Sequence, residues 1–465
     1  MRTKGKKVRW CLVFFAVWIF FCTAGESGAL ALSIEEERQM GQQFFLQVTS
    51  VFHLVEDDFA NTYINDLGQY LLASLEMKPF TFHFYLIQSS DLNAFAGPGG
   101  QIFVFTGLID VMDEVDELAA VMAHEIGHVA ARHISERLEQ NTKLQLVNLA
   151  AALAAALIGG QAQSAIMTGS MAATMQKQLA YSRDDERQAD QLGFRYMSVA
   201  GFDPEGMIKA LKKIQKEQIL ASNQIPAYLL THPGGPERIA NYETMMFGDK
   251  SLIHETAAAT KYRQFFPIFK TILRAKYMDP KDAERAFNRE IEDDPGSTWA
   301  YFGMGIVLRE RLEYDRSIEY FREALKRRPH SIFILRNLAE TYQLMGRSDE
   351  AIPLLSEVLK SDPDDRASLY LMALSYQNLE EYETSIPIFE KLTSMEPVQN
   401  EVYYNLGICF GRLNRLALAH YNFGIYFKKE GKPGRAEFHF QKAEELAKND
   451  PGLKERIKKA MQGPS

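Results

Sequence analysis

The stretch that decides the fold of the first part of this chain is Val121-Met122-Ala123-His124-Glu125-Ile126-Gly127-His128. It follows an acidic run and an apolar run, as suits a helix whose first turn leads into a core. In an α-helix, positions i and i+4 lie one above the other on one face. The imidazoles of His124 and His128 can therefore reach a single cation, and the carboxylate of Glu125 is close enough to contact a water beside it.

This spacing is the His-Glu-x-x-His pattern, which indicates the zinc site of a peptide-bond hydrolase. The alternative is a chance pentapeptide, which a long chain can contain. The small residues Gly127 and Ala130 favour a site, because they leave room for close packing around an ion. His133 stands five positions after His128 and off the ligand-bearing face, so we interpret it as structural.

The composition describes an ordinary folded protein. Of 465 residues, 46% are hydrophobic and 24% are charged, and the length suggests two or three domains. The formal net charge is −8, and no long basic block lies outside the N-terminus. We therefore expect no nucleic acid among the partners.

The N-terminus has the features of a secretory signal peptide. Five basic residues precede an apolar run from Trp10 to Phe21, and Ala29-Leu30-Ala31 fits a cleavage site. We expect residues 1–31 to be removed and the protein to be exported to a bacterial periplasm. The alternative is an inner-membrane anchor through residues 10–24. After cleavage only Cys409 would remain, so no intramolecular disulfide is expected.

A repeat of 34 residues organises the C-terminal part of the chain. Its members are a small residue, an aromatic residue or leucine, and a proline. They are Ala283, Ser317, Ala351, Ser385 and Ala419; Phe287, Phe321, Leu355, Phe389 and Phe423; and Pro295, Pro329, Pro363 and Pro397. This order and period are typical of tetratricopeptide (TPR) repeats, in which stacked helix pairs form a solenoid. The array is predicted from about 264 to 430, with a last helix near 433–447.

The segment between about 34 and 262 is predicted to mix helices and strands. Helices are expected at 35–49 and 58–75, and strands at 80–87 and 102–105. The predicted fold class is therefore an α+β domain, mostly helical with a small sheet, followed by an all-α TPR solenoid. The expected domains are 1–31, 32–262 and 263–465.

An alanine-rich apolar run covers residues 149–160. Twelve residues are too few to span a bilayer. We interpret the run as a helix that is buried or lines a cleft, with peripheral membrane association as the alternative.

A catalytic zinc takes three protein ligands and keeps one position open, so a third ligand must be found. The segment 181–190 offers Glu186 and Asp190, four positions apart on one helical face. The alternative is a solvated charged helix, because the same stretch is crowded with Arg183, Asp184, Asp185 and Arg187. Composition alone favours that alternative.

Two sets of residues resemble a known family. One is His124-Glu125-Ile126-Gly127-His128 with Ser182-Arg183-x-x-Glu186-x-x-Ala189-Asp190-x-x-Gly193, and the other is Asn93-Ala94-Phe95-Ala96-Gly97-Pro98-Gly99-Gly100 with Thr106-Gly107-Leu108. Together they resemble the HtpX/CAAX-protease class of zinc metallopeptidases. With the signal peptide and the TPR repeats, the chain resembles the BepA-type periplasmic proteases of Gram-negative bacteria. Gln188 departs from the family pattern, which usually has a glutamate there; it lies off the ligand face, and we expect the metal site to be unaffected.

The resemblance implies one zinc ion per chain in a zincin-like domain. The ligands would be His124, His128 and Glu186, and Glu125 would act as general base. Asp190, one turn after Glu186, would orient a ligand imidazole through a hydrogen bond.

A strand and a loop complete the expected site. The strand of Ile102, Phe103, Val104 and Phe105 is a candidate edge for pairing with an extended substrate. The resemblance implies that the loop containing His232 lies near the cleft, whereas its Pro/Gly-rich composition alone is that of a simple turn. We hypothesise that His232 approaches the open coordination position and holds the enzyme latent, or else stabilises the oxyanion. Arg238 would anchor the loop through a carboxylate.

These features together predict a periplasmic zinc endopeptidase. The resemblance implies unfolded or misassembled envelope proteins as substrates, and the TPR array would dock them or a partner, such as the outer-membrane assembly machinery. The alternative is a TPR chaperone or scaffold for outer-membrane protein assembly, with a latent or minor protease activity.

Overall fold

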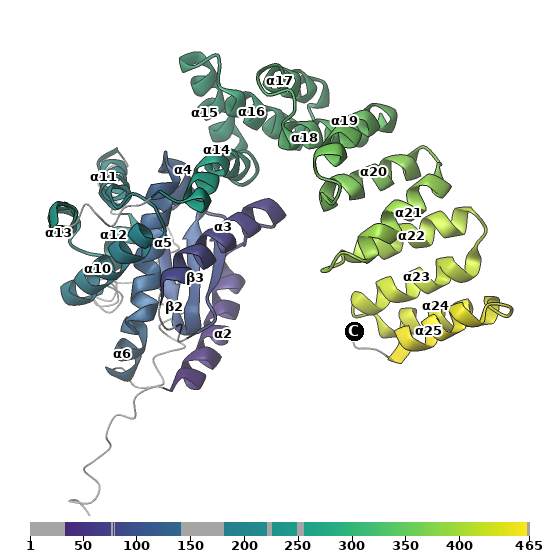
Figure 1. Ribbon diagram of the computed structural model, residues 1–465, viewed down its shortest axis with the longest axis horizontal. Coiled ribbons are helices and arrows are strands. Elements are labelled where there is room, and N and C mark those ends of the chain that lie inside the picture. Colours follow the sequence, from purple (N-terminus) through teal and green to yellow (C-terminus); the bar gives the residue numbers. More distant parts are fainter. Residues whose placement is uncertain are drawn as a thin grey trace, which may run out of the picture. The chain divides into compact units, whose positions relative to one another are not determined.

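The computed structural model describes residues 33–75, 78, 80–140, 181–220, 226–248 and 255–462. It divides into two compact units, Met1–Met278 and Asp279–Ser465 (Figure 1). The expected signal peptide and the apolar run 149–160 lie outside the described residues. Within the described part of the chain, no helix is long and apolar enough to cross a membrane.

The first unit is built in three layers around a small sheet. α2 (Ile34–Val51) covers one face of the sheet, and α3 (Asp58–Leu71) and α5 (Val115–Ala130) cover the other (Figure 1). Aromatic rings fill the interface with α2, where Phe44 lies edge-on to Phe103 with ring centroids 6.1 Å apart. This α+β arrangement confirms the predicted fold class.

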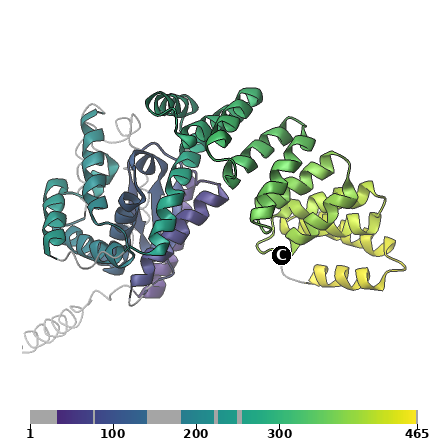
Figure 2. The ribbon, with the colours of Figure 1, turned by 45° about the horizontal axis from the view of Figure 1, so that its top comes forward.

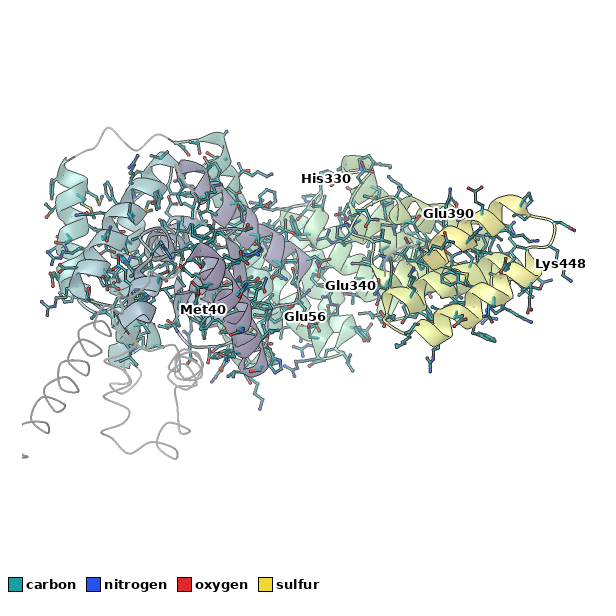
Figure 3. The ribbon with its side chains drawn as sticks, turned by 90° about the horizontal axis from the view of Figure 1, so that it is seen from below. Met40, Glu56, His330, Glu340, Glu390 and Lys448 are labelled. Carbon is teal, nitrogen blue, oxygen red and sulfur yellow. The ribbon has the colours of Figure 1, made fainter. Side chains whose placement is uncertain are left out.

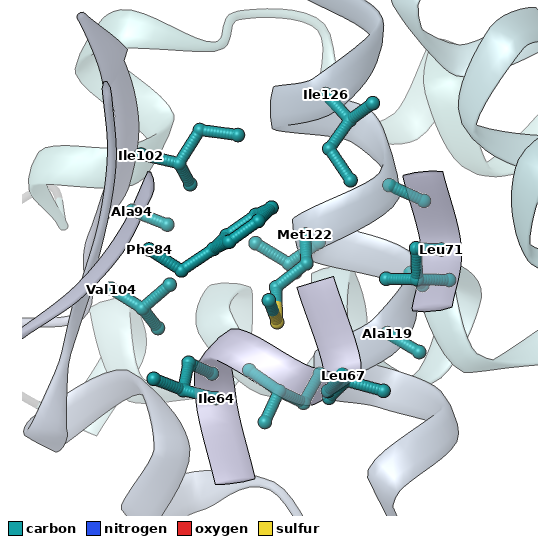
Figure 4. Packing of buried hydrophobic residues seen from close by; sticks show 14 of the residues in the cluster. Ile64, Leu67, Leu71, Phe84, Ala94, Ile102, Val104, Ala119, Met122 and Ile126 are labelled. Carbon is teal, nitrogen blue, oxygen red and sulfur yellow. The ribbon is translucent and has the colours of Figure 1, made fainter. Parts of the chain in front are cut away.

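The interface on the other face forms the main core of this unit. Its side chains come from all three strands and from α3 and α5 (Figure 4), and they include Ile64, Leu67, Leu71, Phe84, Ala94, Ile102, Val104, Ala119, Met122 and Ile126. Burial of apolar surface contributes about 25 cal/mol per Å², so this contact fixes α5 firmly. Since Met122 and Ile126 point into the core, the helical period places His124 and His128 on the opposite face of α5.

The sheet has three strands in the order β1-β3-β2. β1 (His83–Ile87) runs parallel to β3 (Gln101–Phe105), and β2 (Ala94–Gly97) runs antiparallel to it. β2 and β3 are joined by the 3-10 turn η2 (Pro98–Gly100), in which Gly99 has a φ of 68°. Glycine adopts this left-handed conformation without steric cost, which explains the glycine-rich turn.

The predicted edge position of Ile102, Phe103, Val104 and Phe105 is wrong. These residues belong to β3, which is the central strand, and both of its edges are already paired. The run is apolar throughout because it is buried on both faces, between α2 and the layer of α3 and α5. β2, which forms a hairpin with β3, is an edge strand of the sheet.

The other helices that the structure describes in the first unit are α4 (Thr106–Val111), α6 (His133–Gln140), α10 (Arg183–Val199), α11 (Glu205–Leu220), α12 (Ala227–Thr231), α13 (Gly235–Gly248) and α14 (Ala257–Tyr277), with the 3-10 turn η1 (Leu72–Ser74) after α3. Of these, α6, α10, α11 and α14 contact α5. α14 packs on α3, α4 and α5, and its Phe266, Phe269 and Leu273 belong to the main core. The first unit therefore extends to Met278, 16 residues beyond the boundary at 262 expected from the sequence.

The described part of the second unit consists of helices that pack in consecutive pairs. They are α15 (Pro280–Asp293), α16 (Thr298–Glu310), α17 (Tyr314–Arg327), α18 (Ile332–Leu344), α19 (Ser348–Ser361), α20 (Arg366–Asn378), α21 (Tyr382–Thr393), α22 (Asn400–Arg412), α23 (Leu416–Lys429), α24 (Pro433–Leu446) and α25 (Pro451–Gln462). Figure 2 shows them stacked from green to yellow. The predicted TPR helices are confirmed, and α25 follows the helix that the sequence predicts as the last.

Small residues and aromatic rings fit together in several of these pairs. A Cβ added at Gly305 would lie 2.6 Å from the ring of Phe321, and one at Gly407 would lie 2.6 Å from the ring of Phe423. Such distances are too short for carbon atoms in contact, so the rings require glycine at these positions. Polar side chains such as His330 and Glu390 are exposed (Figure 3).

Candidate metal centre

α5 holds the motif residues in a buried position. His124, Glu125 and His128 have no exposed surface. The Nε2 atoms of His124 and His128 lie 3.0 Å apart, so both rings turn the same nitrogen toward one point. The spacing of four residues therefore brings the two imidazoles together as the sequence suggests.

α10 supplies two carboxylates to the same place. Glu186 Oε1 lies 3.4 Å from His128 Nε2, and Glu186 Oε2 lies 3.5 Å from His124 Nε2. One turn later, Asp190 Oδ1 lies 2.9 Å from His124 Nδ1. Glu186 and Asp190 are only 2% and 1% exposed, so this face of α10 is not the solvated charged face that composition alone favours.

Two glycines allow α5 and α10 to approach closely. A Cβ at Gly127 would lie 2.8 Å from the carbonyl oxygen of Ala189, and one at Gly193 would lie 3.1 Å from the backbone nitrogen of His124. Larger residues would push the helices apart. The glycines thus bring Glu186 within reach of the histidines.

The turn between α12 and α13 adds a third imidazole. His232 is fully buried, and its Nδ1 lies 3.0 Å from Glu186 Oε1 and 3.3 Å from His124 Nε2. Its other nitrogen, Nε2, lies 3.4 Å from Glu125 Oε1. His232 therefore stands among the predicted ligands and also faces the predicted general base.

These four groups fit a single metal ion. One donor atom from each of His124, His128, Glu186 and His232 can be chosen so that all four lie within 4.8 Å of one another. The contacts among them range from 3.0 to 3.5 Å. A tetrahedral zinc ion with bonds of about 2.0–2.2 Å needs ligand atoms roughly 3.3–3.6 Å apart. Imidazole and carboxylate are also donors that such an ion accepts, so these residues could hold a metal ion.

Arg238 of α13 neutralises the carboxylates of this site. Its Nε lies 2.9 Å from Asp190 Oδ2, and its Nη2 lies 2.7 Å from Asp190 Oδ1, which makes a bidentate pair. Its Nη1 lies 3.1 Å from Glu186 Oε2, in an ion pair that lacks hydrogen-bond alignment. Although burial disfavours the charged guanidinium, Asp190 and Glu186 raise the pKa of Arg238 above its ordinary value. The contact with a carboxylate that the sequence suggests for Arg238 is therefore present.

The electrostatic environment separates the two glutamates of the site. Burial raises the pKa of Glu125 above its usual value, and neither of its oxygens has a hydrogen-bond partner among the described residues. Burial would also raise the pKa of Glu186, but the nearby His232 and Arg238 lower it well below the usual value. Glu186 is therefore an anion suited to hold a cation, whereas Glu125 is suited to accept and release a proton.

Two tyrosines whose rings stack on histidines of the site are not among the residues predicted from the sequence. Tyr181 stacks on His128 with ring centroids 3.8 Å apart, and Tyr228 stacks on His232 with centroids 4.5 Å apart. Tyr228 precedes His232 by four residues, and this helical spacing is the signal that could have indicated the contact. Tyr181 lies directly before the capping residue of α10, a position that gives no hint of its neighbour.

The sequence also gives no sign that His133 and Gln188 are linked to the predicted metal ligand His128. His133 Nδ1 lies 3.0 Å from His128 Nδ1, and His133 Nε2 lies 2.9 Å from Gln188 Oε1. Gln188, expected to leave the metal site unaffected, thus reaches His128 through one intervening side chain.

The fold and the site are those of a metalloprotease-like domain followed by TPR repeats. Residues 59–246, which include every group of the site, match the model of Peptidase family M48. Three tetratricopeptide-repeat families match residues 279–332, 308–374 and 367–399.

Two curated relatives illustrate what the chain is similar to. The beta-barrel assembly-enhancing protease of Escherichia coli O157:H7 is 35% identical over 220 residues, which are 47% of this chain and 45% of that protein. The protein of the same name from Yersinia pestis is 28% identical over 320 residues, 67% of this chain and 64% of that protein. The matched part thus spans about half of the first relative's length and just under two thirds of the second's. Among solved structures, that of YrrB, a TPR protein with an unusual peptide-binding site, aligns at 18% identity and a TM-score of 0.28, over 38% of this chain and 99% of that one.

Proposed function

We propose that this protein is a zinc-dependent endopeptidase of the bacterial periplasm that degrades misfolded or misassembled envelope proteins. The observation that carries the proposal is the buried set of three imidazoles and one carboxylate, with the carboxylate of Glu125 beside it, which has no hydrogen-bond partner among the described residues. The TPR array would dock substrates or a partner such as the outer-membrane assembly machinery. The name shared by the two relatives, beta-barrel assembly-enhancing protease, supports a protease that acts in the assembly of β-barrel proteins.

His124, His128 and Glu186 would hold the zinc ion, which when bound supplies the Lewis acidity that polarises a scissile carbonyl and activates water. Glu125 takes a proton from the attacking water and passes it to the leaving amine. Asp190 accepts a hydrogen bond from His124 Nδ1, which leaves the lone pair of His124 Nε2 directed toward the ligand cluster.

An extended substrate would pair with β2 at the edge of the sheet, because the central strand β3 is already paired on both sides. Asn93 lies directly before this strand and is fully buried. Both polar atoms of its side chain lack a hydrogen-bond partner among the described residues. Since an unpaired buried amide is costly, Asn93 offers a donor and an acceptor to a substrate backbone.

His232 would keep this enzyme latent. Its Nδ1 completes the four-group set, and its Nε2 faces Glu125, so substrate and water can enter only after the imidazole moves away. A closed set of four protein ligands also characterises structural zinc sites. It therefore favours one alternative function, that of a TPR chaperone or scaffold for outer-membrane protein assembly with a minor protease activity.

Replacement of His232 tests the protease and the chaperone alternative in one experiment. The zinc-loaded wild type, His232→Ala and the control His330→Ala, which changes an exposed histidine of the second unit, are compared on unfolded casein. We expect His232→Ala to cleave roughly tenfold faster than the other two, because loss of the imidazole shifts the population toward the open site. Equal cleavage rates for all three proteins would exclude the role of His232 in keeping the enzyme latent. If every variant retains zinc and none cleaves, the chaperone alternative replaces the protease.

A further inference from the structure

A chain of three side chains leads from the metal site to the surface of the first unit. His128 Nδ1 lies 3.0 Å from His133 Nδ1, and His133 Nε2 lies 2.9 Å from Gln188 Oε1. His133 is 2% exposed, whereas Gln188 is exposed on α10. The far nitrogen of His128, Nε2, is the one that faces the ligand cluster.

When both imidazoles are neutral, the hydrogen bonds that link His128, His133 and Gln188 can run in only two directions. In a neutral imidazole one nitrogen donates and the other accepts. If the Gln188 carbonyl accepts from His133 Nε2, then His133 Nδ1 accepts from His128 Nδ1, and His128 Nε2 presents its lone pair to the cluster. If the Gln188 amide is turned and donates instead, every bond reverses and His128 Nε2 carries a hydrogen. Only the first arrangement leaves His128 able to bind a metal.

We propose that His133 and Gln188 are positioning residues that set the tautomer of His128, and that the amide at 188 makes metal binding weaker than a carboxylate would. A carboxylate at 188 has no hydrogen to donate, so it can only accept from His133, and the hydrogen bonds then run in the direction that lets His128 bind a metal. An amide can donate or accept and so permits both directions. The metal ion would therefore be released more readily from this chain than from a variant with a carboxylate at 188. The inference rests on the proposed metal site and adds to it a control of metal retention.

The position of His133 is fixed independently of Gln188. The preceding residue, Arg132, has a φ of 58°, and its Nη2 donates to Glu37 Oε2 of α2 at 3.1 Å. Ser135 donates to the same oxygen, and Glu37 is 2% exposed. The turn between α5 and α6 is thus held by a buried carboxylate. A substitution at 188 will act on the protons of His133 and leave the turn in place.

The test measures the rate at which the zinc-loaded full chain loses its metal to an excess of chelator. Gln188→Glu should slow release by about 10-fold or more, and His133→Phe, which keeps a ring but removes both nitrogens, should accelerate it by about 10–100-fold. In the His133→Phe background, Gln188→Glu should have no effect. Gln191→Glu is the matched control, because it places the same charge on an exposed position of α10 three residues later.

Three results would overturn the inference while leaving the proposed function intact. The first is an unchanged release rate in Gln188→Glu, and the second is an equal slowing by Gln188→Glu with and without His133. The third is slowing by Gln191→Glu to the same extent, which would assign the effect to charge alone. A wild-type chain that binds no zinc would overturn the proposed function itself, which distinguishes the two failures.

Discussion

Glu125→Gln is expected to lower the cleavage of an unfolded protein by about 10²–10⁴-fold, the range that a general base contributes. The change keeps the size of the side chain and removes its ability to take a proton from water. Both Glu125 oxygens lack hydrogen-bond partners among the described residues, so the substitution breaks no existing hydrogen bond there. Zinc content should remain at one ion per chain, because His124, His128 and Glu186 are untouched.

The measurement is the initial rate of casein cleavage by zinc-loaded protein, with metal content determined on the same samples. Glu136→Gln is the matched control, since it makes the same change at an exposed position of α6. It should cleave like the wild type. Equal cleavage by Glu125→Gln and wild type would refute the role of Glu125. Loss of zinc in Glu125→Gln would mean that the variant tests metal binding and would assign Glu125 to the ligand set.

Arg238→Leu is expected to destabilise the metal-free first unit by about 3–5 kcal/mol, the cost of leaving buried charges without a partner. The guanidinium is 2% exposed and contacts two carboxylates, Asp190 and Glu186, which are equally buried. Leucine removes the one guanidinium that contacts both anions and leaves them only their contacts with the imidazoles of the site. Calorimetry of the metal-free full chain should show the transition of this unit lowered by roughly 10 °C.

A surface pair provides the control for this prediction. Arg183 lies 3.3 Å from Glu237, but its side chain is 76% exposed, so Arg183→Leu should change stability by less than about 1 kcal/mol. The double variant Arg238→Leu, Asp190→Leu should recover part of the loss, because an apolar pair replaces a buried ion pair at little cost. An Arg238→Leu transition within 2 °C of the wild type would show that the pair contributes little.

The local patterns of the sequence predict most of the elements. A spacing of four residues places His124 and His128 together, and the 34-residue period predicts the helix pairs from α15 onward. The same period recurs in backbone conformation, because Leu312, Gly346, Glu380 and Asn414 all have positive φ at intervals of 34. Only one of the four is glycine, so the sequence alone does not predict these turns.

The features that the sequence does not predict depend on contacts between distant elements. The order of the strands is one of them, because β3 is apolar on both faces whether it lies at the centre or at an edge. The contacts of His133 are another, since they require the turn after α5 to meet α10. The extent of the first unit is a third, because the end of α14 lies in the stretch from about 264 that is predicted as repeats and yet α14 packs on α3, α4 and α5.

The metal centre is tested most directly by anomalous diffraction from crystals of the zinc-loaded protein, recorded on both sides of the zinc absorption edge. We expect one strong peak per chain above the edge, within bonding distance of His124 Nε2, His128 Nε2 and the Glu186 carboxylate, and its loss below the edge. The absence of a peak among these residues, or a peak bound elsewhere on the chain, would contradict the proposed site.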